Sequence, residues 1–585
     1  MTVSRLDAKS LLAIDIGATA TRAMLFDAVE GSYRYLAEGN APTTVGAPVR
    51  DVSEGVRLAL DQLQTISGRR LIDGEERLIT PTGSDGTGVD AFVATYSAGT
   101  PLRVFAVGLL DDISLESARH LVSTTYAKLI GTLALTDRKK IEEQIDLIIR
   151  LRPDLILIAG GTDNGASQSV YNLIEPVGLA CYLMGKEGKP EVLFAGNRTL
   201  AEEVKARLGP VATVHIAPNV RPGLDEEQLG PAQFKMVEVI REILRRQVQG
   251  MHELATWADD RVIPTGTAFG RVIRFLSKVY DPTKGVLGVN IDGSATTIAA
   301  SFAGDLRLSV YPELSIGEDL GRRFPADQLG NVLRWLPFKL TAGDLHDYLY
   351  NRSLYPDSLP VNPEELAIDQ AVARELLRHA LLRTRPSLPV AAAGPHPDLL
   401  PWFEPIVAAG AMLTRAPAPG QSLLMLLDGI QPTGVTTLVL DQNNLSPALG
   451  AAATINPMLT VQVLESTGTF LNLGTVISPV GNARPGTPVM QARLVYDDDS
   501  EIKVDIKMGT IELLSLPTGQ AARLHVQPLQ RFDIGMGGPG RGGSLRVIGG
   551  ALGVVIDARG RPLRLPEDDA RRFEILKKWQ WVLGK

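Results

Sequence analysis

The chain has 585 residues, a net charge of −7 and 44% hydrophobic residues. These values predict a globular protein of about three or four domains and give no reason to expect nucleic acid or an anionic membrane as partner. Cys181 is the only cysteine, which excludes an intrachain disulfide and a thiolate metal cluster. Residues 1–10 are polar and charged, and no apolar run reaches the ~18 residues of a membrane span. The sequence therefore predicts a cytoplasmic protein.

The first predicted element is a β-hairpin over 11–27. An apolar run of strand length stops at Asp15-x-Gly17, small hydroxyl residues follow, and a second apolar run resumes. Gly17 would let the backbone approach an anion, and Thr19 and Thr21 offer hydroxyl groups. Asp15 is suited to hold Mg²⁺ through water, because that ion keeps several of its waters. A phosphate-binding loop and an ordinary tight turn are both open interpretations.

A helix is predicted at 50–66. The glycine-rich loop at 76–89 fits either a linker or a phosphate contact. A strand-helix alternation comes after this loop. From 141 to 219 the alternation predicts a parallel α/β sheet. Ligands bind beyond the carboxyl ends of such strands, although glycines there can also simply turn the chain. No G-x-G-x-x-G motif supports a dinucleotide site. The candidate residues at these strand ends are Gly160, Gly161, Asp163 and Asn197.

The second half begins with an echo of the first hairpin at 286–300, where Asp292-Gly293 and hydroxyl residues separate two apolar strands. Helical stretches are predicted over 320–382. From 457 the pattern changes to alternating apolar and polar residues, which predicts an all-β region that ends in a helix. A glycine-rich stretch at 534–544 fits a loop or a backbone nest for an anion. The predicted strands of the β-rich region are 460–465, 489–496, 501–506 and 510–514.

Several of these motifs together resemble the actin, sugar-kinase and heat-shock chaperone ATPase superfamily. More closely, the chain resembles the MutL/GlmL family, proteins encoded beside adenosylcobalamin-dependent glutamate mutase. The resemblance covers roughly residues 10 to 455. The motifs that carry it are 13–27, 94–99 before 106–108, 157–163, 194–197, 218–220, 295–297, 317–321 and the stretch near Gly410.

The resemblance implies an α/β fold with an ATP cleft between two RNase-H-like lobes. The first lobe would span 10–285, with an α/β insertion at about 150–220, and the second lobe 286–456. A β-rich domain at 457–585 would follow, outside the family. ATP with Mg²⁺ would close the lobes and hydrolysis would open them, which is how a reactivating chaperone would exchange damaged cobalamin on its mutase.

The resemblance also assigns site residues. Asp15, Gly17, Thr19 and Thr21 would form the first phosphate loop, with Asp15 as the catalytic and metal-binding carboxylate. The second loop would span 290–297, with Asp292 as a second catalytic candidate, and Gly410 would lie in the adenosine turn. Further nucleotide-binding residues implied for the second loop are Gly293, Thr296 and Thr297.

The second half departs from the family pattern at two places. Ungapped alignment places Asn290-Ile291-Asp292 where the family has Asp-x-Gly, although a one-residue slip would let Asp292 replace the missing acid. Gly410-Ala411 stands where the family has Gly-Gly. ATP hydrolysis and nucleotide binding without hydrolysis therefore both remain open.

Two other functions are compatible with the sequence. A degenerate actin-like scaffold would bind a partner protein through the β-rich region and the basic end of the chain. A small-molecule kinase of the same superfamily would need a catalytic base, and no Asp or His stands out for that role. The seven histidines include no H-x-x-x-H pair, so Mg²⁺ is the only metal expected.

Overall fold

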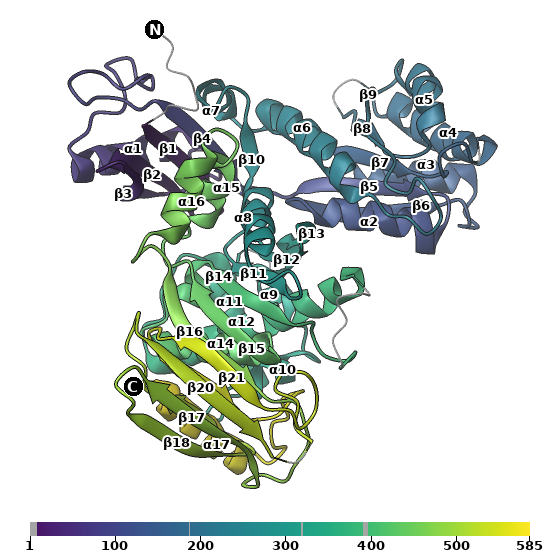
Figure 1. Ribbon diagram of the computed structural model, residues 1–585. Helices are drawn as coiled ribbons and strands as arrows, with labels where there is room; N and C mark the ends of the chain where they lie inside the picture. Colours follow the sequence, from purple (N-terminus) through teal and green to yellow (C-terminus); the bar gives the residue numbers. More distant parts are fainter. Residues whose placement is uncertain are drawn as a thin grey trace. The chain divides into compact units, whose positions relative to one another are not determined.

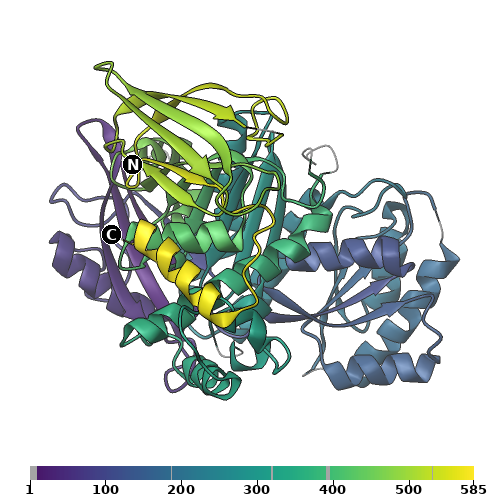
Figure 2. The same cartoon turned by 90° about the horizontal axis from the view of Figure 1, so that it is seen from below.

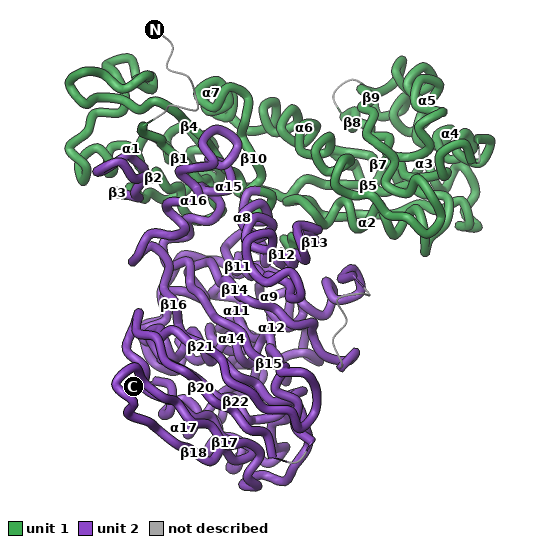
Figure 3. Tube along the Cα trace, in the orientation of Figure 1, with its two compact units in different colours: residues 1–25, 36–267, 309–312 green, residues 26–35, 268–308, 313–585 purple. Residues whose placement is uncertain are grey.

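The computed structural model describes residues 9–165, 167–185, 188–317, 320–389, 396–529 and 531–584. Glu318 and Asp319, part of the 317–321 motif, lie outside these residues. The chain divides into two compact units (Figure 3). Unit 1 comprises residues 1–25, 36–267 and 309–312, and unit 2 comprises residues 26–35, 268–308 and 313–585.

A five-stranded sheet opens the chain, with the strand order β10-β4-β1-β2-β3. β1 pairs in parallel with β4, and β4 pairs in parallel with β10. Helices α1 (Val52–Ser67) and α7 (Met251–Trp257) cover this sheet through a shared apolar core. The predicted hairpin is confirmed as β1 and β2. The strands are β1 (Ser10–Ile16), β2 (Ala20–Val29), β3 (Ser32–Pro42), β4 (Ala91–Tyr96) and β10 (Val262–Pro264).

An inserted parallel sheet in unit 1 has the order β6-β5-β7-β8-β9 (Figure 1). The predicted alternation is confirmed, but the sheet begins at Leu102 rather than near 150, because β5 and β6 also pair into it. Helices α2 and α6 cover one face, and α3, α4 and α5 cover the other. The elements are β5 (Leu102–Gly108), α2 (Glu116–Ser123), β6 (Ala127–Ala134), α3 (Ile141–Leu151), β7 (Leu155–Ala159), α4 (Gln168–Leu183), β8 (Glu191–Phe194), α5 (Ala201–Leu208), β9 (Thr213–Ile216) and α6 (Leu229–Gln247).

An eight-stranded sheet forms the centre of the second half, with the order β13-β12-β11-β14-β15-β16-β22-β19. β11 and β12 are the hairpin predicted at 286–300, and they pair in antiparallel fashion. β11 pairs in parallel with β14, and β14 with β15. The strands are β11 (Gly285–Ile291), β12 (Thr296–Phe302), β13 (Asp305–Tyr311), β14 (Phe403–Ala409), β15 (Gly434–Leu440), β16 (Leu471–Ser478), β19 (Ile511–Leu514) and β22 (Val554–Asp557).

The first five strands of the two sheets follow the same order. In chain order of the strands, each sheet reads third, second, first, fourth, fifth, and the fourth and fifth strands are parallel to the first. This is the RNase-H-like arrangement that the sequence resemblance implies. The mid-chain echo of the first hairpin is therefore the start of a structural repeat, and the α/β prediction is confirmed.

The C-terminal region is β-rich, as predicted, but it does not stand apart from the second repeat. β16, β22 and β19 extend the eight-stranded sheet, and a four-stranded antiparallel sheet packs on that extension through an apolar core. The strands of the second layer alternate buried and exposed residues, as half-buried strands must. They are β17 (Pro488–Tyr496), β18 (Glu501–Lys507), β20 (Ala521–Pro528) and β21 (Gly543–Ile548).

The strand predicted at 460–465 is wrong, because this segment belongs to helix α16 (Pro457–Glu465). Asn456 caps the helix, with its Oδ1 accepting from Leu459 N at 3.0 Å, and Pro457 occupies the first turn, where proline is well suited. Thr460 Oγ1 donates to Leu449 O in the neighbouring helix α15 (Ser446–Ala452) at 2.9 Å. The cap and this packing override the β propensity of the segment.

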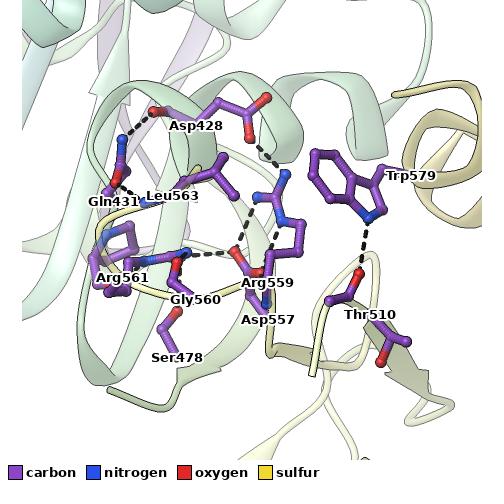
Figure 4. Close-up of polar contacts among 12 residues, drawn as sticks. Asp428, Gln431, Ser478, Thr510, Asp557, Arg559, Gly560, Arg561, Leu563 and Trp579 are labelled. Carbon is purple, nitrogen blue, oxygen red and sulfur yellow. Dashed lines mark hydrogen bonds and ion pairs between the residues drawn. The ribbon is translucent and has the colours of Figure 1, made fainter. Parts of the chain in front are cut away.

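A buried cluster of charges links the segment at the end of β22 to helix α14 (Pro419–Gly429; Figure 4). Arg559 donates to both carboxylate oxygens of Asp557, at 2.8 and 2.9 Å, and to Asp428 at 2.7 Å. Arg561 donates to Asp557 at 2.7 Å. Burial raises the pKa of Asp557, but the two guanidinium groups outweigh it and hold that pKa below its ordinary value. The Trp579 ring centroid lies 4.6 Å from the Arg559 guanidinium carbon.

The remaining helices surround the second sheet or follow it. The terminal helix α17, yellow in Figure 2, packs against α14 and beside β19. None of the described helices combines the length and apolar character needed to cross a bilayer. The helices are α8 (Thr265–Val279), α9 (Leu320–Arg323), α10 (Leu329–Leu333), α11 (Ala342–Leu354), α12 (Pro363–Thr384), α13 (Ala411–Thr414), α14 (Pro419–Gly429), α15 (Ser446–Ala452) and α17 (Asp569–Leu583).

Candidate functional site

The β1–β2 hairpin in unit 1 brings together the four residues predicted for the first phosphate loop. Asp15 is the sixth residue of β1, and Gly17 and Thr19 lie in the turn that follows. Gly17 N donates to Ala20 O at 2.9 Å and closes the turn. A Cβ at Gly17 would lie 3.0 Å from Ala20 O, so the turn is tight but not sterically closed to a small side chain.

Two hydroxyl groups hold the carboxylate of Asp15. Asp15 is 5% exposed, and its Oδ1 accepts from Thr95 Oγ1 at 2.6 Å and from Thr265 Oγ1 at 3.1 Å. Thr95 pairs with Asp15 in the β1–β4 register, whereas Thr265 begins α8 directly after β10. The carboxyl ends of three neighbouring strands thus converge on one carboxylate. Such support fixes the position of an anionic group that would otherwise be costly to bury.

Thr21 is the fourth residue of this loop. It is fully buried in β2, and its Oγ1 has no hydrogen-bond partner among the described residues. A buried hydroxyl without a partner carries a free-energy cost, so each such group calls for an explanation.

The β11–β12 hairpin in unit 2 closes with the same backbone hydrogen bond. Asp292 N donates to Ala295 O at 3.1 Å, as Gly17 N does to Ala20 O. Counting back from this bond, Asn290 occupies the position of Asp15, and Asp292 occupies that of Gly17. The ungapped alignment is therefore the one the structure adopts, and the one-residue slip that would put Asp292 in place of the acid does not occur.

The carboxylate of Asp292 is engaged within its own turn. Its Oδ1 accepts from Ser294 N at 2.8 Å, Ala295 N at 2.9 Å and Ser294 Oγ at 2.5 Å. Its Oδ2 accepts from Asn290 Nδ2 at 3.2 Å. Asp292 thus occupies backbone N–H groups that could otherwise face a phosphate oxygen. The other predicted residues of this loop lie close by, with Gly293 in the turn and Thr296 and Thr297 buried in β12.

Gly410 lies beside the second loop and admits no side chain. Its φ is +86°, and a Cβ there would lie 2.1 Å from Ile291 O and 2.5 Å from Asn290 Oδ1. Asn290 Oδ1 has no hydrogen-bond partner in the described part of the chain. The residue predicted for the adenosine turn is therefore required as glycine by its backbone conformation and by this close approach.

The four residues proposed at the strand ends of the insertion lie in neighbouring loops, and the side chains of Asp163 and Asn197 are engaged by other residues of those loops. Asp163 Oδ1 accepts from Arg198 N and from Asn219 Nδ2, both at 3.0 Å. Asn197 accepts from Thr199 N at 3.0 Å and caps the helical turn that follows. These contacts fit the interpretation that the residues turn the chain and hold the loops together.

A magnesium ion bound with a nucleotide is compatible with the first loop. No three His, Cys, Asp or Glu side chains of the described residues gather as a metal site. Mg²⁺ in phosphate sites needs only one or two carboxylates, because phosphate oxygens and water complete its coordination. Asp15 supplies one such carboxylate.

Sequence reasoning missed Thr95 and Thr265 as partners of Asp15. Both signals were visible in the sequence, because Thr95 lies in the quoted 94–99 motif and Thr265 directly follows a strand and begins a helix. What the sequence did not reveal is that residues 80 and 250 positions away in the chain converge on one carboxylate oxygen.

Two sheets of RNase-H-like order, each opening with a hairpin that carries a small hydroxyl-bearing turn, define the actin-like ATPase fold class. A protein-family model described as MutL protein matches residues 11–467. The chain therefore belongs to the MutL protein family. The match ends before β16, so the four-stranded sheet of the C-terminal region lies outside it.

Solved structures show weaker likenesses, and no curated protein matches the chain. The nucleotide-free structure of acetone carboxylase is 13% identical, with a TM-score of 0.30, over 85% of this chain and 81% of that chain. Diol dehydratase-reactivating factor in nucleotide-free form is 9% identical, with a TM-score of 0.30, over 78% of this chain and 100% of that chain. Component A of (R)-2-hydroxyglutaryl-CoA dehydratase from Acidaminococcus fermentans is 10% identical, with a TM-score of 0.24, over 76% of this chain and 97% of that chain. These TM-scores are too low to carry an argument, so the fold class rests on the strand order.

Proposed function

We propose that the chain binds Mg·ATP at the loop of its β1–β2 hairpin and uses the nucleotide in a chaperone cycle on an adenosylcobalamin-dependent mutase. Membership of the MutL protein family and the repeated actin-like sheet support this proposal. The observation that carries it furthest is Asp15, a buried carboxylate held by two hydroxyl groups beside a glycine turn.

In this proposal the loop of unit 1 makes the main phosphate contacts. Gly17 leaves the turn without a side chain, so a phosphate can approach the backbone. The hydroxyl of Thr19 donates to a phosphate oxygen. Thr21 is fully buried, and a Cβ at Gly55 of α1 would lie 3.2 Å from its Oγ1, so we assign Thr21 no phosphate contact. Asp15 holds Mg²⁺ through water, and the cation, when bound, neutralises charge on the phosphates.

The loop of unit 2, taken by itself, is less suited to a phosphate. A phosphate that approaches Ser294 N and Ala295 N must displace the carboxylate of Asp292, which already accepts from both. The two negative charges would also repel each other. We therefore propose that nucleotide binding depends mainly on Asp15, and that hydrolysis is slow with Asn290 and Asp292 in the second loop.

Nucleotide binding and turnover test the first part of this proposal. Mg·ATP or Mg·ADP should raise the melting temperature of the full chain, since a ligand at 100 times its Kd stabilises by about 2.7 kcal/mol. Hydrolysis of ATP should be lost in Asp15→Ala and retained in the matched control Asp112→Asn, whose carboxylate is exposed. The proposal fails if the wild type shows neither a shift in melting temperature nor hydrolysis.

A reactivation assay tests the partner. Glutamate mutase inactivated by damaged cobalamin is mixed with the full chain, free adenosylcobalamin and Mg·ATP. Mutase activity should return only with ATP present and should not return with Asp15→Ala. Recovery that is equal without ATP would contradict a nucleotide-driven cycle.

A partner-binding scaffold that does not hydrolyse ATP is the second candidate, and the outer face of the four-stranded sheet favours it. Arg493 on β17 lies directly opposite Lys503 and His525 on the flanking strands, and Arg523 lies directly opposite Arg546. Like charges that face each other across strands destabilise an antiparallel sheet. Glu501 contacts both Arg493 and Lys503, whereas Arg523 and Arg546 make no ion pair with any described residue.

The same face is hollowed, with a cavity of about 810 Å³ that Arg493, Lys503 and His525 help to line. Among the described residues that line it there is no Phe, Tyr or Trp side chain, and His525 is the single ring. An acidic protein segment suits this face better than single-stranded nucleic acid, whose binding relies on stacking against aromatic rings.

Charge reversal tests whether this sheet face is the partner surface. Arg523→Glu with Arg546→Glu should abolish capture of the mutase in pull-downs while leaving the response to Mg·ATP unchanged. If the double variant still captures the mutase, the sheet face is not the partner surface.

A further inference from the structure

A cavity of about 260 Å³ in unit 1 belongs to neither hairpin loop. It lies between the first sheet and the insertion. One wall comes from α6 and α7, and the other comes from the ends of β4 and β10 and the start of β5. Both walls belong to the same compact unit.

The interior of this cavity is apolar. On α6, Val237, Ile240 and Leu244 follow one another at spacings of three and four residues, so their side chains share one helix face. Met251 and Ala255 of α7 add a second apolar stripe at a spacing of four, and both are almost fully buried. Small-molecule sites are concave and mostly apolar, with a few polar groups that fix the orientation of the ligand.

Three guanidinium groups supply those polar groups. Arg241 and Arg245 stand one position after Ile240 and Leu244 on α6, and Arg103 stands at the start of β5. Arg245 pairs with Asp260 at 2.8 Å and contacts His252 at 3.1 Å, and Arg241 donates to the carbonyl oxygen of Asp260. Each guanidinium carries five N–H donors, so these contacts leave further donors on each.

One carboxylate lines the cavity, and donors of the chain itself engage it. Asp154 accepts from Arg103 N at 2.9 Å and from Gln247 Nε2 at 3.1 Å. Three arginines face two aspartates, Asp154 and Asp260, which leaves a net charge of +1. The cavity thus joins an apolar interior to a cationic rim.

We propose that this cavity binds a small amphipathic anion, with an aliphatic body against α6 and α7 and a carboxylate or phosphate head at the arginines. Guanidinium groups recognise both heads through paired N–H donors. The bound molecule would contact the first sheet and the insertion together, and so would hold one against the other. The inference does not depend on the proposed nucleotide site.

Calorimetric titrations of the full chain with octanoate, octyl phosphate, octanol and octylammonium test this inference. Octanoate or octyl phosphate should bind at least tenfold more tightly than octanol, and octylammonium should not bind. The preferred head distinguishes a carboxylate ligand from a phosphate ligand. Equal affinities for octanoate, octyl phosphate and octanol would overturn the assignment.

Substitutions in α6 test whether the anion binds in this cavity. Arg241→Gln with Arg245→Gln should weaken binding of the preferred anion at least tenfold and that of octanol less than threefold, whereas the exposed control Arg138→Gln should change neither. Leu244→Trp, which places a larger ring in the cavity, should block both ligands, while retention of the circular dichroism spectrum shows that it folds. Undiminished anion binding in the double arginine variant would overturn the proposal even if Leu244→Trp fails to fold.

Discussion

The two hairpin loops share a backbone and differ in chemistry. Gly17 and Asp292 each donate their backbone N–H to the carbonyl three residues on, so the turn itself does not require glycine. Asp15 is supported by hydroxyls from strand β4 and from the start of helix α8, whereas Asp292 accepts from amides of its own turn. The comparison teaches that this hairpin turn can keep its shape while its backbone donors are taken by a side chain.

The two repeats also differ at the far edge of their sheets. The first sheet ends at β10, whereas the second continues through β16, β22 and β19 and carries the buried charge cluster beside that extension. The extension adds long-range pairing that has no counterpart in the first repeat.

Breaking the charge cluster should have the largest effect on stability. Arg559→Met removes one of the two arginine partners of Asp428 and of Asp557, which keep Arg374 and Arg561, and should cost about 3 kcal/mol in the free energy of unfolding. Urea unfolding followed by tryptophan fluorescence measures it. The exposed control Arg541→Met should change stability by no more than about 0.5 kcal/mol. A cost below about 1 kcal/mol for Arg559→Met would show that the cluster does not anchor the extension.

A glycine-to-alanine substitution should lower the free energy of unfolding by different amounts at Gly410 and at Gly17. Gly410→Ala combines a positive φ with a Cβ 2.1 Å from Ile291 O and should cost about 3 kcal/mol. Gly17→Ala meets its nearest atom at 3.0 Å and should cost about 1 kcal/mol. Chemical denaturation of both variants gives the comparison. Equal costs would contradict the different packing of the two glycines.

Restoring the family pattern in the second loop should raise catalysis. Asn290→Asp with Asp292→Gly returns the acid and frees Ser294 N and Ala295 N for a phosphate. The rate of ATP hydrolysis should rise about tenfold, which corresponds to about 1.4 kcal/mol of transition-state stabilisation. Steady-state phosphate release measures this rate. An unchanged rate in a folded double variant would show that these two residues do not limit hydrolysis.

A pH-dependent pair should produce the smallest effect, confined to unit 1. His120 Nδ1 lies 2.9 Å from Glu227 Oε1, and this hydrogen bond raises the pKa of His120 above 6.5. Burial raises the pKa of Glu227, but His120 outweighs it and holds that pKa below 4.5. The contribution of His120 to the free energy of unfolding is full below pH 6.5 and is lost as the pH rises through the pKa of His120 in the folded protein. The contribution of Glu227 is full above pH 4.5 and is lost as the pH falls through the pKa of Glu227 in the folded protein.

The pair should therefore stabilise most between pH 4.5 and 6.5. Melting temperature against pH measures this window, and His120→Gln should flatten the curve. His346→Gln, an exposed histidine in unit 2, is the control. A curve for His120→Gln that keeps the wild-type shape would assign the pH dependence to other groups.

The sequence predicted what local patterns determine. The helix predicted at 50–66 spans Val52–Ser67 in the structure, and both hairpins lie where apolar runs flank small residues. The helix at 457–465 was mistaken for a strand, because its cap at Asn456 and its packing on α15 outweigh β-branched residues. The partners of Asp15 and the extension of the second sheet depend on pairing across long stretches of chain, which periodicity does not encode.

Calorimetric titration of the full chain with ATP, with and without Mg²⁺, tests the central claim most directly. The account predicts one binding event that Mg²⁺ strengthens and that Asp15→Asn weakens at least tenfold, whereas Asp292→Asn weakens it less than threefold. Binding that is equal in the wild type and Asp15→Asn, or no binding in the wild type, would contradict the account.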